Sequence, residues 1–168
     1  RVDPVDFNSY AVLCFASIYS EKLDEAETYL KERKRIFGNS RTITSLEIRL
    51  RFDRGSYQKV IQQCDSLKAK GESLKANELY LLSGAYFKLS QHRESTANFS
   101  QLKAIKDPKE DVSYFTALSF ALRHETDSCF FYLQKAFERR EKLFRTFKIE
   151  PALKELRKDP RYVKLYLD

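Results

Sequence analysis

The chain has 168 residues, 42% hydrophobic and 33% charged, a balance that excludes intrinsic disorder and suffices for one domain with its own core. No apolar stretch approaches the roughly 18 residues of a membrane span, and four Gly and four Pro leave no flexible linker. The formal net charge of +7 permits acidic partners. Because the sequence contains no Met, we expect a fragment of a larger protein or a processed form.

Apolar residues at three- and four-residue intervals predict four consecutive helix pairs, in residues 7–40, 41–75, 76–109 and 110–140. In the first unit the apolar stripe runs through Tyr10, Leu13, Cys14 and Ile18, and then through Ala26 and Leu30. A helix pair that shows one apolar stripe per helix packs that stripe against its neighbours.

The second unit is ambiguous because residues 43–52 alternate apolar and polar side chains, as a half-buried strand does. Ile43, Leu46 and Leu50 also fit one stripe of a helix. A single strand among helices would have no strand to pair with, so we predict a helix. Residues 55–57 then supply a turn and an N-cap for the next helix.

The third unit is the clearest, and the fourth follows its pattern. In the third, Leu79, Leu82 and Tyr86 form one stripe, and Ser95, Phe99 and Leu102 form the second, before Pro108 ends the unit. In the fourth, the stripes are Phe115, Ala117, Phe120 and Ala121, and then Cys129, Leu133 and Ala136. We therefore predict an all-α fold with two helices in each unit.

The register of the pattern breaks after residue 140. Residues 143–149 are strongly apolar, Pro151 begins a short segment, and Asp159-Pro160 provides an N-cap and first-turn proline for a last helix. We predict that residues 141–168 form a helical cap over the exposed end of the helix stack.

Thin side chains recur at a fixed interval along the four units. Ala26, Val60, Ser95 and Cys129 are separated by 34, 35 and 34 residues, and each is followed four positions later by a core-type residue. A larger side chain at these positions would overpack a close helix crossing. The three cysteines all fall at such packing positions and lack any CxxC spacing, so we expect buried thiols rather than disulfides or a zinc site.

These units resemble the tetratricopeptide repeat, whose pattern is W-x2-L-G-x2-Y, then A-x3-F, then P. The third unit matches best, with Leu79, Leu82, Ser83, Tyr86, Ser95, Phe99 and Pro108 at the corresponding places. The resemblance implies a right-handed α-solenoid over residues 1–140. The motif from Pro151 to Tyr162 is similar to the tail that closes many bacterial proteins of this kind, which implies a bacterial source.

In tetratricopeptide arrays the first helix of each pair lines a concave groove. The resemblance therefore implies a partner-binding surface formed by Phe15, Tyr19, Arg49, Phe52, Tyr80, Phe87, Lys88, Tyr114 and Phe115. Five of these would be apolar anchors, namely Phe52, Tyr80, Phe87, Tyr114 and Phe115. Arg49 and Lys88 would orient carboxylates or carbonyls of the partner. Two alternatives stay open: the rings pack between units, or a missing N-terminal region of the chain or a neighbouring protomer fills the groove.

Family members that hold chaperone C-termini use a Lys and an Asn one turn apart on the first helix. Ala11 and Phe15 occupy those places here, so we expect no binding of chaperone tails.

The sequence offers no constellation for catalysis. His92 and His124 fall in predicted turns without neighbouring metal-ligand spacing, and the phosphate-loop, dinucleotide and nucleophile-elbow motifs do not occur. We therefore expect no enzyme activity, no metal and no cofactor.

The predicted function is protein–protein interaction, in which a partner peptide or helix lies in the groove. One alternative is the sensor or regulatory part of a larger signalling protein or transcription regulator. Another is a basic nucleic-acid-binding solenoid, since residues 135–168 hold 11 Lys/Arg against 6 Asp/Glu. We expect a cytoplasmic protein, or a periplasmic one if a signal peptide was removed. Neither the oligomeric state nor the identity of the partner can be inferred from the sequence.

Overall fold

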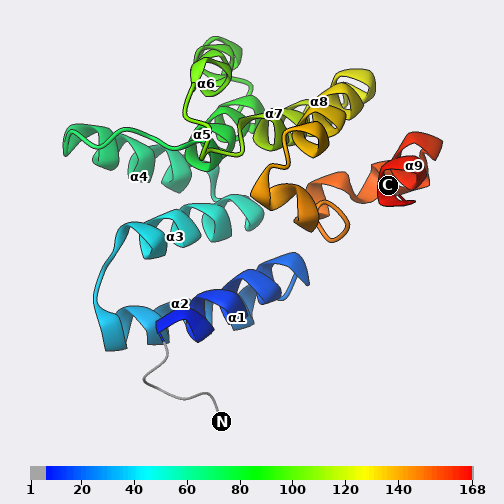
Figure 1. Cartoon of the computed structure of the whole chain (residues 1–168). Coiled ribbons are helices and arrows are strands. Elements are labelled where there is room, and N and C mark those ends of the chain that lie inside the picture. The colour runs from blue at the N-terminus through cyan, green and yellow to red at the C-terminus, as the bar shows by residue number, and fades with distance from the viewer. Residues whose placement is uncertain (1–6, 168) are drawn as a thin grey trace.

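The computed structural model describes the backbone of residues 7–167 and the side chains of residues 9–165. This part of the chain is helical, without strands (Figure 1), which confirms the predicted all-α class. The elements are α1 (Phe7–Tyr19), α2 (Leu23–Phe37), α3 (Arg41–Asp53), α4 (Tyr57–Ala69), α5 (Ala76–Lys88), α6 (His92–Ala104), α7 (Val112–Leu122), α8 (Thr126–Glu138), the 3₁₀ helices η1 (Lys142–Thr146) and η2 (Pro151–Lys158), and α9 (Pro160–Leu167).

The thin side chains that recur along the sequence lie where the two helices of a pair meet. Ala26, Val60 and Cys129 are fully buried, and Ser95 is buried as well. Ser95 on α6 and Ser83 on α5 each donate a hydroxyl hydrogen bond of 2.9 Å to the other's backbone carbonyl. A hydroxyl can donate to the backbone of the other helix in this way only where the two helices approach closely.

The four pairs also turn in the same way. Glu21, Gly55, Ser90 and His124 have φ angles of 58°, 72°, 59° and 60°, in the left-handed region. In each turn the next backbone N–H donates to the carbonyl five residues earlier, at 2.8 to 3.0 Å. This arrangement satisfies carbonyls that the helix end would leave unpaired. The turns recur at intervals of 34, 35 and 34 residues, the same intervals as the thin side chains.

Helix α3 is buried on two sides. Ile43, Leu46 and Leu50 belong to an N-terminal hydrophobic cluster with α1 and α2, whereas Ile48 and Phe52 belong to the larger cluster of the remaining helices. Apolar residues on two helix faces produce a near-alternating sequence. That is the physical reason why residues 43–52 resemble a strand although they form a helix.

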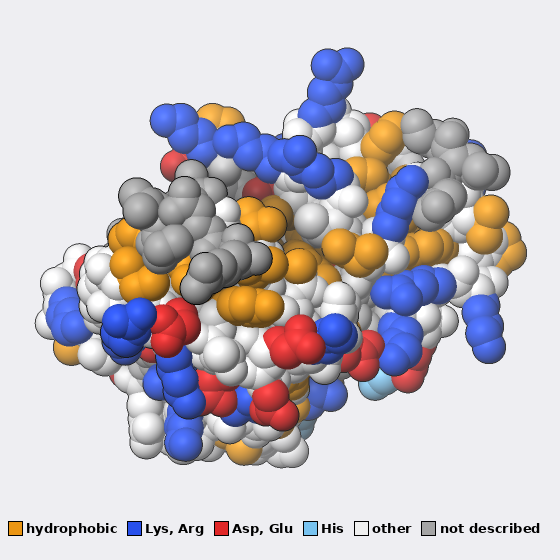
Figure 2. Space-filling view, turned by 90° about the horizontal axis from the view of Figure 1, so that it is seen from below, with side chains coloured by type: hydrophobic (Ala, Val, Ile, Leu, Met, Phe, Trp, Pro, Cys, Tyr) orange, Lys and Arg blue, Asp and Glu red, His pale blue; other side chains and the backbone are white. Residues whose placement is uncertain are grey.

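The end of the array formed by α1 and α2 carries exposed apolar side chains. Val12 is 63% exposed, whereas Leu46, Leu81 and Phe115, at the same position of the later units, are buried by the unit that precedes each of them. Seen from below (Figure 2), hydrophobic side chains gather across the middle of this face, and Lys and Arg lie along its upper edge and at its right.

The C-terminal segment packs against α8 and also turns back across the helices. Arg161 near the start of α9 pairs with Asp127 at 2.7 Å, and its guanidinium lies 4.4 Å from the ring centre of Phe130. Residues 142–158, orange in Figure 1, instead run back toward α3. The C-terminal segment therefore contacts α3 as well as α8.

Replacement of Gly84 by Ala tests the close packing of α5. A Cβ atom there would lie 2.8 Å from Leu122 Cδ2 on α7 and 2.9 Å from the Phe52 ring on α3. Helix propensity alone would favour Ala by about 1 kcal/mol. We expect steric overlap to prevail, with a net loss of about 1–3 kcal/mol in the free energy of unfolding, measured with urea.

Thr96→Ala on the exposed face of α6 is the control and should be nearly neutral. A Gly84→Ala protein as stable as the wild type would show that Phe52 and Leu122 are not fixed against α5.

Candidate binding groove

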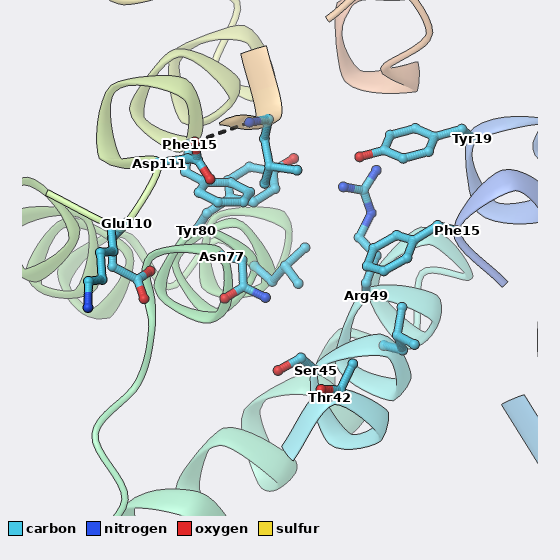
Figure 3. A pocket seen from close by; sticks show the side chains of 14 residues that line it. Phe15, Tyr19, Thr42, Ser45, Arg49, Asn77, Tyr80, Glu110, Asp111 and Phe115 are labelled. Carbon is cyan, nitrogen blue, oxygen red and sulfur yellow. Dashed lines mark hydrogen bonds between the residues drawn. The ribbon is translucent and has the colours of Figure 1, made fainter. Parts of the chain in front are cut away.

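A cavity of about 240 Å³ opens between α1, α3, α5 and the start of α7 (Figure 3). Its lining comprises Phe15, Tyr19, Thr42, Ser45, Leu46, Arg49, Asn77, Tyr80, Leu81, Lys109, Glu110, Asp111, Phe115 and Leu143. The wall is mostly apolar, with a few polar groups that point into the space, as is usual for binding pockets.

The repeat explains why these residues meet. Phe15 on α1 and Arg49 on α3 are 34 residues apart, and Ser45 and Tyr80 are 35 apart, so equal positions of successive units lie side by side. In Figure 3, Phe15, Tyr19 and Arg49 form one side of the cavity, and Asn77, Tyr80 and Phe115 form the other.

The chain's own C-terminal segment borders the cavity and contacts the elements around it. The hydroxyls of Tyr114 on α7 and Thr146 on η1 are 3.1 Å apart, and Asp111 accepts a hydrogen bond of 3.1 Å from the backbone N–H of Leu143. Further along, Glu150 pairs with a residue of α3, and Lys154 pairs with Glu21 in the turn between α1 and α2 at 3.0 Å. The segment is therefore joined to elements at both ends of the array.

Arg49 is the centre of the buried polar cluster. Its Nη2 lies 2.8 Å from Glu150 Oε1, and its Nε donates to Asp53 Oδ2 at 2.7 Å. Glu150 is fully buried and also accepts from the backbone N–H of Ala152, which caps η2. Burial alone would lower the pKa of Arg49, but the facing carboxylates of Glu150 and Asp53 hold that pKa well above its usual value.

Three tyrosine hydroxyls lie around this cluster. Burial, and then the charge of Glu150, raise the pKa of Tyr114, and burial is also the main cause of the raised pKa values of Tyr19 and Tyr80. These phenols therefore stay protonated and act as neutral hydrogen-bond donors. The three side chains therefore offer hydroxyl groups and no phenolate.

The predicted anchors are mostly part of the wall, which corrects their expected exposure. Phe52, Tyr80, Tyr114 and Phe115 are all buried, and their rings form a continuous row with centroid separations of 5.8 to 6.0 Å. Such a row stabilises the stacking of α3, α5 and α7. Phe15, 43% exposed, is the ring most available to a partner among the predicted residues.

The predicted cations differ from expectation as well. Arg49 is already paired with two carboxylates of the same chain, so it does not offer a free charge to a partner. Lys88 lies outside the cavity, beside Pro151 and Ala152 of the C-terminal segment. Phe87 also lies outside it and packs against the Arg123 guanidinium at 5.2 Å.

Sequence reasoning missed three residues of the site. In the sequence, Glu150 looks like any acidic residue that flanks a helix. Only the folded chain brings it next to Arg49. The Asn77 amide and the Lys109 ammonium line the cavity and have no hydrogen-bonding or ion-pair partner for these groups among the described residues. The sequence did contain a signal for Asn77, because Asn77 lies three residues before Tyr80 and thus on the same face of α5.

The cysteines and histidines do not line the groove cavity. Cys14, Cys64 and Cys129 are buried free thiols, as predicted, and burial raises the pKa of Cys64 to about 12. His92 and His124 are exposed. Within residues 7–167 no three His, Cys, Asp or Glu side chains are placed to hold a metal ion, and no helix is long and apolar enough to cross a membrane.

A double-mutant cycle tests the buried ion pair. Arg49→Gln or Glu150→Gln alone leaves the other charge without its main partner, so each should lower the free energy of unfolding by about 3 kcal/mol. The double variant should lose clearly less free energy of unfolding than the two single variants lose together. The reason is that removing both charges leaves neither Arg49 nor Glu150 as a buried charge without its partner.

Lys154→Gln, which breaks the exposed pair with Glu21, is the control and should cost less than about 1 kcal/mol. Strict additivity in the cycle would show that Glu150 does not contact Arg49.

Asp53 should impose a pH dependence. Burial raises the pKa of Asp53 although Arg49 lies beside it, and Glu150 raises it further. Because the folded-state pKa is above the unfolded value of 3.8, its contribution to stability is present below that pH and is lost as pH rises through the folded-state pKa. Asp53→Asn cannot ionise, so its stability relative to wild type should rise between about pH 3 and pH 7.

Urea unfolding at a series of pH values measures this difference, and Asp65→Asn on the exposed side of α4 serves as control. A relative stability of Asp53→Asn that falls as pH rises would contradict the described environment of Asp53.

A scan against protein-family models, a search among curated proteins and a search among solved structures each gave no match for this chain. Any function must therefore be inferred from the geometry of the chain itself.

Proposed function

We propose that this chain is a non-enzymatic protein-interaction module that binds a short segment of a partner protein in the open part of its concave groove. The proposal includes a tetratricopeptide-like, right-handed solenoid of four units with a C-terminal cap. Support for that architecture comes from the common interval of the thin side chains and of the left-handed turns, 34, 35 and 34 residues in both cases.

The single observation that carries the binding function is the cavity of about 240 Å³ between α1, α3 and α5. Phe15 and the buried row of rings behind Tyr80 supply an apolar surface for one or two side chains of the partner. The Asn77 amide can donate to and accept from the backbone of an extended segment. Lys109 at the rim can pair with a partner carboxylate.

The size of the cavity limits the partner. The C-terminal segment already occupies the part of the groove beside α7, so a long helix cannot lie along all four units. The open part therefore suits a short segment with an apolar side chain and a nearby acidic residue.

A peptide-display selection against the purified chain tests the proposal. Peptides enriched by the wild type should bind Phe15→Ala and Asn77→Ala at least about tenfold more weakly, since a well-placed anchor contributes roughly 2 kcal/mol. Isothermal titration calorimetry measures the affinities, and thermal melting verifies that each variant is folded.

Phe131→Ala is the matched control, because Phe131 on α8 is an exposed ring outside the cavity. Peptides that bind all three variants as tightly as wild type would show that the groove is not the binding site.

A further inference from the structure

A second cavity, of about 210 Å³, is distinct from the groove and strongly basic. It lies between the end of α6, the start of α7 and α8, and shares no residue with the groove cavity. Four cations line it, namely Lys103, Lys106, Lys135 and Arg139. The other lining residues include Ser113, Thr116 and Tyr132, whose hydroxyls add polar character.

The ammonium groups of this cavity are not neutralised by the chain. Lys103, Lys106 and Lys135 have no ion pair with any carboxylate of the described residues. Two of them lie over rings: Lys103 Nζ is 4.7 Å from the centre of Phe99, and Lys135 Nζ is 5.7 Å from that of Tyr132. Ring faces attract the ammonium groups and help to hold them in place without cancelling their charge.

None of the residues that line the cavity is acidic, and the carboxylate that pairs with Arg139 is already engaged. Glu141 lies 3.6 Å from Arg139, and its two oxygens accept hydrogen bonds from the backbone N–H groups of Ser113 and Tyr114 at 3.0 and 2.8 Å. Glu141 therefore caps the start of α7 and balances at most one of the four positive charges.

Another basic cavity in the molecule shows the contrast. Lys31, Lys34, Arg51, Arg54 and Lys59 line a space between α2, α3 and α4, but Glu27 and Glu47 line it too. Lys31 and Arg54 pair with Glu27, and Lys34 pairs with Glu47. Three of the five cations of that cavity are thus paired with carboxylates that line it, whereas Lys103, Lys106 and Lys135 have no such partner among the described residues.

We propose that the cavity between α6, α7 and α8 binds a phosphate monoester, carried either by a free small molecule or by a phosphorylated side chain of a partner. A dianionic phosphoryl group has three acceptor oxygens, which match several ammonium and guanidinium donors through charge-assisted hydrogen bonds. The hydroxyls of Ser113 and Tyr132 can complete its coordination. A cavity of this size, lined by four cations, suits one phosphoryl group better than a nucleic-acid backbone, which needs a longer row of cations along a surface.

Calorimetric titration of the full chain with O-phosphoserine, at constant ionic strength, tests the proposal. Serine and glutamate are the comparison ligands, and a short peptide with one central phosphoserine is the second phosphate source. We expect O-phosphoserine to bind and serine not to bind. Tighter binding of the phosphopeptide would assign the phosphorylated side chain as the source, and weaker binding would assign the free monoester.

The variant Lys103→Gln/Lys135→Gln should weaken phosphoserine binding by about tenfold for each cation removed. Lys31→Gln/Lys59→Gln is the matched control, since it removes the same charge from the other basic cavity and should bind as wild type does. Lys106→Gln, at an exposed position, replaces the double variant should the latter fail to fold.

Two results would overturn the proposal. One is no phosphoserine or phosphopeptide binding by the folded wild type. The other is equal weakening in both double variants, which would indicate an effect of net charge alone. A single-stranded RNA oligonucleotide that binds more tightly than either phosphate source, with steep salt dependence, would assign a nucleic-acid surface instead.

Discussion

The ion pair between Arg49 and Glu150 joins the C-terminal segment to α3, and the arrangement of the groove depends on it. The two residues are 101 positions apart, and both are largely removed from water. A buried guanidinium and a buried carboxylate each require the other, because either one alone carries a large desolvation cost. The pair therefore holds the C-terminal segment against α3, and the segment in turn covers the groove beside α7 and leaves the cavity beside α1 open.

The functional differences between the units arise at equal positions of the repeat. Phe15, Arg49, Gly84 and Leu118 occupy the same place on the first helix of each pair. Phe15 is exposed, Arg49 holds the C-terminal segment, Gly84 leaves room for Phe52 and Leu122, and Leu118 is buried. Residues that follow the repeat form the common helix packing. Residues that depart from it produce the open cavity beside α1 and the region beside α7 that the C-terminal segment covers. The same holds for the basic cavity, where unpaired lysines of α6 and α8 replace the ion pairs found around α2 and α4.

Much of the fold was predictable because it depends on local pattern. Helical spacing of apolar residues located the helices, and the thin residues located the crossings, since both follow from steric requirements within a few residues. Only the sequence of α3 was ambiguous between helix and strand, because this helix is buried on two faces. Arg33, at the position of Leu67 and Leu102 in later units, departs from the apolar pattern: it is buried although it is charged.

The site was less predictable because its contacts are distant in the sequence. Nothing around Glu150 distinguishes it from an exposed acid, so its pairing with Arg49 could not be inferred before the path of the chain was known. The burial of Tyr80 and Tyr114 has the same origin, since the helices on either side of them and the returning segment together exclude water. Phe15 stays exposed because, within residues 7–167, no further helix pair packs on the outer side of α1.

Zero-length cross-linking tests most directly whether the C-terminal segment crosses the concave side. A carbodiimide joins a carboxylate to an amine only where the two already touch, and Lys154 Nζ lies 3.0 Å from Glu21 Oε1, 133 residues away. Mass spectrometry of the digested monomer should identify a peptide pair that links Glu21 to Lys154. Links of Lys154 only to acids near it in the sequence, with Glu21 unlinked to it, would contradict the returning segment and the groove that depends on it.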